Sequence, residues 1–157
     1  MTGPIQLTAA DGHQLGAYRA RPENRRAPGL VVIQEIFGVN PHIRSVADRF
    51  AGQGFDAVAP ALFDRVRPGI ELGYEADDIA RGREIRAKIA QADAMKDVAA
   101  AIALLRGEGR KVGVVGYCWG GSLAWVAATD LDGVAASVSY YGGQVGETAP
   151  WPKKPSA

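Results

Sequence analysis

The sequence predicts an α/β fold of three layers, in which helices cover both faces of a mostly parallel β-sheet. Two observations carry this prediction. Short apolar runs, typical of strands that are buried on both faces, alternate with longer segments whose apolar residues recur every three or four positions, as in helices. The chain has 157 residues, of which 47% are hydrophobic, and this fits a single domain over residues 1–157 with a sizeable core.

An antiparallel hairpin is expected at the N-terminus, over residues 5–20. Two strand-like runs flank Asp11 and Gly12, a dipeptide that readily adopts the positive φ values of a hairpin turn. A polar loop then leads to the first buried strand, at residues 30–33. A short basic run borders this loop and is expected to be solvated surface; it consists of Arg19, Arg21, Arg25 and Arg26.

A helix should follow the first buried strand. Asn40 is a good N-cap, and Pro41 fits the first helical position, where its missing N–H costs nothing. One face of this helix is marked by Ile43, Val46, Ala47 and Phe50. Residues 54–60 form the next predicted strand.

A long helical pattern extends from Asp77 to Arg106, with a break expected near Gln91. Its apolar positions are Ile85, Ile89, Ala92, Met95, Val98, Ile102 and Leu105. A strand at 110–116, a helix at 119–129 and a final strand at 133–142 complete the expected order. Glu35, Asp64 and Cys118 should then lie at the carboxyl ends of strands, where the chemistry of such folds is found.

Gly116 and Gly120 flank Cys118, the only cysteine, where a predicted strand becomes a helix. This is the G-x-S-x-G nucleophile elbow with cysteine in place of serine, and its glycines relieve crowding at a sharp, strained turn. The N-terminus of the following helix favours thiolate over thiol. The opposing interpretation is that Cys118 is a small buried apolar residue.

The backbone N–H of Trp119 would form one half of an oxyanion hole, and the loop after the earlier strand should supply the other half. That loop begins at Glu35 and Ile36, so the N–H of Ile36 is the candidate. A carboxylate directly after a buried strand is unusual unless it lies at the mouth of the sheet. The alternative interpretation is that Glu35 is an ordinary surface charge at the end of a strand.

Two segments of the sequence resemble the dienelactone hydrolase (carboxymethylenebutenolidase) family of the α/β-hydrolase fold. Residues 31–63, which contain QEIFGVN, are similar to the family's Q-E-I-F-G-x-N segment and to the helix and strand after it, and residues 111–121, KVGVVGYCWGG, are similar to its G-Y-C-x-G-G elbow. Residues 139–143, SYYGG, resemble the strand that follows. The similarity extends over nearly the whole chain.

The resemblance implies hydrolysis of a lactone or related ester through an acyl-cysteine intermediate. Cys118 would be the nucleophile, Glu35 the carboxylate that helps to generate the thiolate, and Ile36 and Trp119 the donors of the oxyanion hole. An arginine holds the substrate carboxylate in family members that act on dienelactone. Arg81 lies in the corresponding region, and Arg83 is nearly as good a candidate; a solvated helical arginine is the alternative for both.

The usual order of this fold is nucleophile, acid and then histidine, but no histidine follows Cys118. His13 and His42 lie in earlier elements and are expected to be surface residues. Asp130, Asp132 and Glu147 follow the elbow without a histidine to orient. We therefore expect a family member that lacks its C-terminal part. The strand from Val134 to Tyr140 would then be an exposed edge, open to pairing with a second copy.

A second hypothesis is a catalytically inactive domain that acts in binding or assembly. Cofactors, metals, nucleic acid and membranes are not expected. The net charge is +1, no apolar run is long enough to span a bilayer, and the glycine spacing does not fit a dinucleotide fingerprint. Ser122 is placed inside a helix, which argues against a serine esterase. One cysteine and the absence of a recognisable secretory signal favour the cytoplasm.

Overall fold

The computed structural model of the chain describes residues 2–143 and 145. Within this part, six strands form one sheet. They are β1 (Gly3–Thr8), β2 (Gln14–Ala20), β3 (Gly29–Ile33), β4 (Asp56–Pro60), β5 (Val112–Tyr117) and β6 (Val134–Tyr140). The helices are α1 (Pro41–Gly52), α2 (Ala76–Ala87), α3 (Gln91–Gly107) and α4 (Trp119–Asp130), with a 3-10 helix η1 (Leu62–Arg65).

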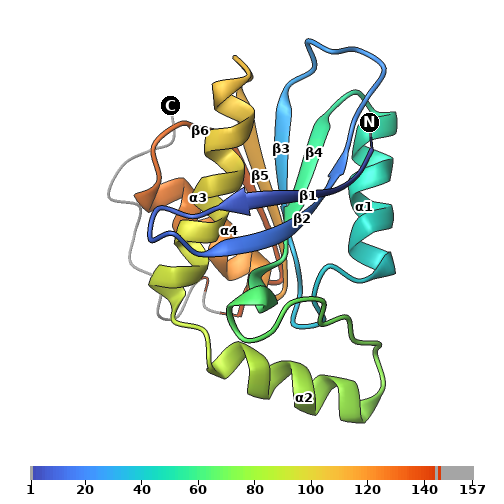
Figure 1. Ribbon diagram of the computed structural model, residues 1–157, viewed down its shortest axis with the longest axis vertical. Helices are drawn as coiled ribbons and strands as arrows, with labels where there is room; N and C mark the ends of the chain where they lie inside the picture. The colour runs from blue at the N-terminus through green and yellow to red at the C-terminus, as the bar shows by residue number, and fades with distance from the viewer. Residues whose placement is uncertain (1, 144, 146–157) are drawn as a thin grey trace.

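The strands are arranged in the order β1-β2-β4-β3-β5-β6. Strands β4, β3, β5 and β6 run parallel to one another, while the hairpin of β1 and β2 is antiparallel and also joins β4 antiparallel. Helix α1 covers one face of the sheet, and α3 and α4 cover the other (Figure 1). The predicted three-layer α/β fold, with an N-terminal hairpin and a mostly parallel sheet, is confirmed.

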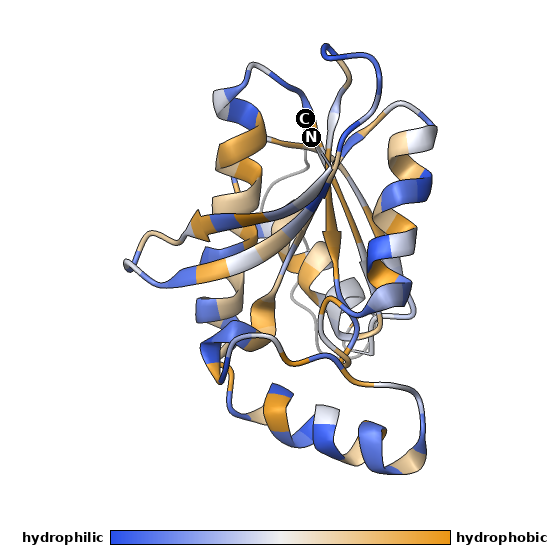
Figure 2. Ribbon diagram, turned by 45° about the vertical axis from the view of Figure 1, so that its right-hand side comes forward, coloured by the Kyte–Doolittle hydropathy of each residue, from blue (hydrophilic) through white to orange (hydrophobic). Residues whose placement is uncertain are grey.

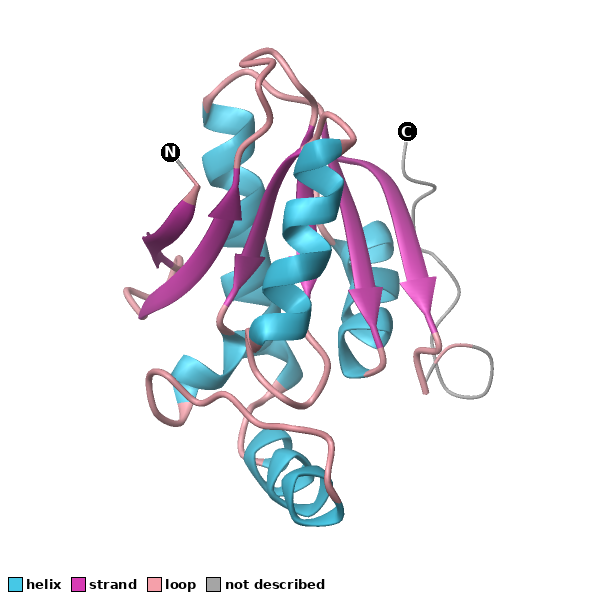
Figure 3. Ribbon diagram, turned by 90° about the vertical axis from the view of Figure 1, so that its right-hand side faces the viewer, coloured by secondary structure: helices cyan, strands magenta, loops and turns pink. Residues whose placement is uncertain are grey.

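The carboxyl ends of the parallel strands all point toward α2 (Figure 3). Helix α2 lies beyond the sheet rather than on either face, and it is largely hydrophilic (Figure 2). Only Gly82 and Ile85 of this helix are buried. The loops after β3 and β4 and the turn after β5 therefore lie at the end of the sheet that faces α2 (Figure 3).

The hairpin turn differs in detail from the expectation. Residues 9–13 form a five-residue loop, closed by a hydrogen bond of 2.8 Å from the N–H of Ala9 to the carbonyl of His13. Gly12 has a φ of +84°, but Asp11 does not share a positive φ, because a loop of this length needs only one such residue.

Asn40 starts α1 as predicted. Its side-chain oxygen accepts a hydrogen bond of 3.1 Å from the N–H of Ile43, which satisfies one of the free amides of the first helical turn. Pro41 is the first helical residue. The side-chain amide of Asn40 also donates to the carbonyl of Leu72, 3.1 Å away, so the same residue holds the segment before α2.

The expected break near Gln91 is also present. The chain leaves the helical conformation at residues 88–90, and α3 restarts at Gln91. The interruption allows α3 to lie along the sheet while α2 lies across its carboxyl ends (Figure 1).

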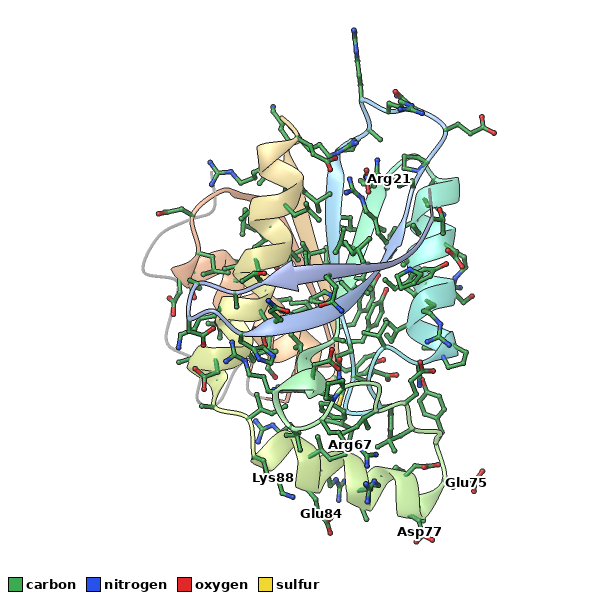
Figure 4. The ribbon with its side chains drawn as sticks, viewed as in Figure 1. Arg21, Arg67, Glu75, Asp77, Glu84 and Lys88 are labelled. Carbon is green, nitrogen blue, oxygen red and sulfur yellow. The ribbon has the colours of Figure 1, made fainter. Side chains whose placement is uncertain are left out.

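The basic run was interpreted incorrectly at Arg19. This residue lies on β2 and is only 3% exposed, and its guanidinium donates to both carboxylate oxygens of Asp56 at 2.8 Å and to Glu108. Arg110 completes the buried group, 2.9 Å from Asp56. Strand alternation turns Arg19 inward, whereas Arg21, Arg25 and Arg26 are exposed as expected. Figure 4 places Arg21 at the end of the molecule opposite to α2.

The core consists of two apolar clusters, one on each side of the sheet. The larger is formed mainly by the sheet, α3 and α4, and the smaller lies under α1. Every residue of β3 and β4 is buried, as their apolar runs predicted. Within the described residues, no helix combines the length and apolar character needed to cross a membrane.

Candidate active site

Cys118 occupies a sharp turn between β5 and α4. Strand β5 ends at Tyr117 and α4 begins at Trp119, so the chain passes from strand to helix within one residue. Its backbone angles are φ 56° and ψ −118°, a strained combination for a residue with a side chain. Cys118 is partly exposed, and its thiol is therefore not sealed in the apolar interior.

The glycines of the elbow are required by close approach of the backbone. A Cβ on Gly116 would collide with the carbonyl of Gly120, and one on Gly120 would collide with the carbonyls of Ile33 and Gln34. Gly121 has the same relation to the carbonyl of Tyr140. The crowding predicted for this turn is thus confirmed.

The elbow is also fixed to the adjacent strand. The N–H of Cys118 donates a hydrogen bond of 3.0 Å to the carbonyl of Tyr140, the last residue of β6. The carbonyl of Cys118 accepts from the amides of Gly121 and Ser122, at 2.9 and 3.2 Å. Ser122 is buried in the first turn of α4, as expected for a residue that is not the nucleophile.

Glu35 lies two residues beyond the end of β3 and is 9% exposed, so it is not an ordinary surface charge. The neighbouring Gln34 is fully buried and fixes this loop. Its side-chain amide donates to the carbonyl of Glu35, and its side-chain oxygen accepts from the N–H of Leu62 at 3.1 Å.

Two tyrosine hydroxyls hold the carboxylate of Glu35. The hydroxyl of Tyr74 donates to Oε2 at 2.9 Å, and that of Tyr141 donates to Oε1 at 3.1 Å. Partial desolvation of its hydroxyl and the neighbouring charge of Glu35 raise the pKa of Tyr141 to about 12, and desolvation also raises the pKa of Tyr74. Both phenols therefore remain protonated donors at neutral pH, and Tyr141 brings Glu35 and Cys118 into one site.

The two proposed oxyanion-hole amides lie in the turn after β3 and at the start of α4. Trp119 is the first residue of α4 and Ile36 follows Glu35, and neither backbone N–H makes a hydrogen bond within residues 2–143 and 145. The ring of Trp119 is buried, with its centroid 5.9 Å from that of Phe63. Their role in binding an oxyanion remains a prediction.

Arg81 and Arg83 lie on α2, on either side of Gly82. A Cβ on Gly82 would collide with the carbonyl of Ile36, so α2 packs directly against the loop of the predicted oxyanion hole. Both arginines are exposed. Figure 4 shows Asp77 and Glu84 on the side of α2 that faces away from the sheet, and Lys88 just after the end of this helix. The contact at Gly82 brings this helix to the site, while the role of Arg81 remains a prediction.

Three other residues that the sequence analysis considered are Asp64, His13 and His42. Asp64 lies in η1, after β4, where it accepts from the amide of Gly16 at 2.8 Å. His13 lies on the hairpin turn, while the ring of His42, in the first turn of α1, is 6.1 Å from that of Tyr74.

Among the acidic residues after the elbow, Asp130 is the exposed last residue of α4, and Asp132 is exposed just beyond it; Glu147 lies outside the described residues. Residues 2–143 and 145 contain no group of three or more histidine, cysteine or acidic side chains suited to a metal ion.

Sequence reasoning missed Tyr74 and Tyr141. Tyr74 is in the irregular segment before α2, and Tyr141 follows the last described strand. The one available signal was the pair of tyrosines at 140 and 141, directly after a strand that adjoins the elbow strand.

The comparisons with known proteins agree on one family. The profile of the dienelactone hydrolase family matches residues 15–156. A carboxymethylenebutenolidase from Pseudomonas putida is 39% identical over 149 residues, which cover 90% of this chain and 61% of the relative. Carboxymethylenebutenolidase 1 from Cupriavidus pinatubonensis is 38% identical over 146 residues, covering 88% of this chain and 60% of the relative. The chain thus spans about three fifths of these curated relatives.

Solved structures show the same fold. A Klebsiella pneumoniae protein assigned to the dienelactone hydrolases superposes with a TM-score of 0.73 at 29% identity, covering 98% of this chain and 66% of that protein. A dienelactone hydrolase-like phosphotriesterase from metagenomic libraries gives 0.65 at 24% identity, covering 90% of this chain and 60% of its own. The sequence match over most of the chain, together with the elbow and its sheet, establishes that this chain belongs to the dienelactone hydrolase family.

Proposed function

We propose that this chain carries the nucleophile part of a hydrolase that cleaves a lactone or related carboxylic ester. The observation that carries the proposal is the strained conformation of Cys118, φ 56° and ψ −118°, at the start of α4. A turn of this kind presents the side chain of its central residue at the mouth of the sheet. Relatives named carboxymethylenebutenolidase support the same class of reaction.

Acylation begins when the proton of the Cys118 thiol passes to the carboxylate of Glu35. The thiolate attacks the carbonyl carbon of the ester and forms a carbon–sulfur bond, while the carbonyl π electrons move to oxygen. The amides of Ile36 and Trp119 donate to that oxyanion, because they have no other partner in the described residues. Its collapse breaks the carbon–oxygen bond of the ester, and the leaving alkoxide takes the proton back from Glu35.

Hydrolysis of the acyl-cysteine completes the reaction. Water adds to the thioester carbonyl, the carbon–sulfur bond breaks, and the products are a carboxylic acid and the restored thiol. For a cyclic ester, both product groups remain in one hydroxy acid. No oxidant, reductant or metal takes part in this sequence.

An anionic substrate would suit the position of α2. Gly82 packs on the carbonyl of Ile36, and Arg81 and Arg83 extend from the same turn of helix with exposed side chains. An arginine on a helix that packs on this loop can pair with a carboxylate elsewhere on the substrate. We assign this role to Arg81, with Arg83 as the alternative.

The test is stoichiometric acylation by an activated ester such as p-nitrophenyl acetate. The intact chain should release nitrophenol in a rapid phase of one equivalent, and mass spectrometry should find the acetyl group on Cys118. Cys118→Ala should lower this rate by about a thousandfold or more. Equal rates in the two proteins would overturn the proposal.

A second candidate function is assembly through β6. This strand is at the edge of the described sheet, its sequence VAASVSY contains no charged residue, and Val138 and Tyr140 are 48% and 49% exposed. Uncharged edge strands pair readily with another chain. A second copy, pairing through its own β6, is the partner that we propose.

A further inference from the structure

The carboxylate of Glu35 is held from two sides. Tyr74 comes from the segment that precedes α2, and Tyr141 comes from the residue after β6, so one hydroxyl reaches each carboxylate oxygen from a different part of the fold. Burial is the main cause that raises the pKa of Tyr117, and the charge of Glu35 adds a smaller contribution. Among the described residues, the side-chain hydrogen-bond partners of the carboxylate are the hydroxyls of Tyr74 and Tyr141, and neither is a cation.

Tyr74 is positioned by other residues. Its ring centroid is 4.6 Å from that of Phe37, and its hydroxyl lies 3.4 Å from the side-chain amide of Asn40. The amide of Asn40 donates to the phenol oxygen, which leaves the phenol proton directed at Glu35. Since Asn40 also caps α1, Tyr74 is held by a residue that the helix fixes. The ring of His42 packs against it from the same helix.

Tyr141 is held by its backbone. With a φ of 42°, it joins Cys118 as one of the two non-glycine residues with a positive φ in the described part of the chain. The next residue, Gly142, lies against the start of α4, where a Cβ would meet the amide of Ser122 at 2.7 Å. The ring itself is 65% exposed, so apolar packing does not explain why its hydroxyl turns inward. Strained residues persist where the surroundings require them, and the close packing of Gly142 on α4 fixes the backbone next to Tyr141.

We propose that Tyr141 and Tyr74 are positioning residues for Glu35 in thiol activation. This inference rests on the proposed role of Glu35 as the acceptor of the Cys118 proton. Two O–H donors stabilise the ionised form of a carboxylate and restrict its rotation. The pair therefore holds the carboxylate of Glu35 in one orientation, through Tyr141 after β6 on one side and Tyr74 before α2 on the other.

The experiment measures the rate of alkylation of Cys118 by iodoacetamide across acidic to alkaline pH. The reagent is uncharged, and Cys118 is the only cysteine, so one rate is observed. Tyr141→Phe and Tyr74→Phe remove only a hydroxyl. In each variant we expect the acid-side midpoint of the profile to move upward by about one pH unit, with a larger shift in the double variant. Tyr140→Phe is the matched control, because its ring stacks on Tyr117 and no hydrogen bond of its hydroxyl is present among the described residues; it should reproduce the parent profile.

The Glu35→Gln variant distinguishes failure of the positioning proposal from failure of the proposed function. If it removes the Glu35-dependent limb while the tyrosine variants match the parent chain, then the positioning role is wrong and the proposed function stands. If Glu35→Gln also matches the parent chain, then Glu35 does not assist the thiol and both proposals fail. Circular dichroism of each variant establishes that the comparison is made between folded proteins.

Discussion

The carbonyl oxygen of Ile33 occupies the space that a side chain on Gly120 would need. This contact joins the end of β3 to the first turn of α4, and it sets the distance between the loop that carries Glu35 and the elbow that carries Cys118. Replacement of Gly120 by alanine should therefore affect both the fold and the site.

Gly120→Ala is expected to lower the free energy of unfolding by about 1–3 kcal/mol, because the added methyl group forces the backbones of β3 and α4 apart. Urea denaturation measures this difference. Gly107→Ala is the matched control, since a Cβ at the end of α3 meets nothing within 4 Å; it should be neutral or stabilising by up to about 1 kcal/mol. A loss of stability in Gly107→Ala as large as that in Gly120→Ala would contradict the steric explanation.

The buried ion-pair group predicts an acid-dependent loss of stability. Hydrogen bonding to Arg19 is the main cause that lowers the pKa of Glu108 from 4.5 to about 2. Because the folded chain holds this carboxylate in its charged form, its contribution is complete above about pH 5 and is lost as the pH falls toward 2. Glu108 is 33% exposed, so solvent screens the pair, and we expect about 1–2 kcal/mol.

Glu108→Gln should flatten the decline of unfolding free energy over this acidic range. Glu23→Gln is a suitable control, because Glu23 is an exposed acidic residue in the loop after β2. Parallel curves for the parent chain and Glu108→Gln would show that the pair does not contribute to folding.

Self-association should depend on the apolar character of β6. Val138→Lys places a charge on the edge strand, which disfavours pairing with a second copy. Light scattering over a range of protein concentrations should show a lower mean mass for this variant than for the parent chain. Val66→Lys, at an exposed valine next to η1, should leave the mass unchanged. A monomeric parent chain at every concentration would rule out the assembly proposal.

Arg81→Gln should discriminate between substrates. We expect it to slow acylation of Cys118 by an activated ester that bears a carboxylate by about tenfold, the effect of losing one charge-assisted hydrogen bond. Acylation by a neutral ester should be unaffected. Arg83→Gln is the companion variant, and a selective effect there instead would move the assignment to Arg83. If neither variant is selective, α2 does not bind the substrate anion.

The sequence predicted features that depend on local spacing. Asn40 and Pro41 identify the start of α1 because a cap and the first helical turn involve only neighbouring residues. The glycines around Cys118 identify the elbow for the same reason, since the crowding arises within a few residues of the turn. The interruption before Gln91 follows from the change in helical periodicity.

Contacts between distant segments were beyond this kind of reasoning. Glu35 is separated by 39 positions from Tyr74 and by 106 from Tyr141, and both tyrosines lie in irregular segments where no periodicity points to a partner. The error at Arg19 has a similar origin. An arginine near other arginines is usually exposed, but here Asp56 and Glu108 approach from other elements and compensate the buried charge.

Asn40 has two structural roles, as the N-cap of α1 and as a hydrogen-bond donor to the segment before α2. Serine or aspartate would begin α1 about as well, because each has an oxygen that accepts from the amide of Ile43. Neither has an N–H group that could reach the carbonyl of Leu72 and the phenol of Tyr74, as the amide of Asn40 does. The contacts with the neighbouring loop therefore favour asparagine over the other N-cap residues. Replacement of Asn40 by serine or aspartate would preserve the helix cap but remove the contact with Tyr74, which donates to Glu35.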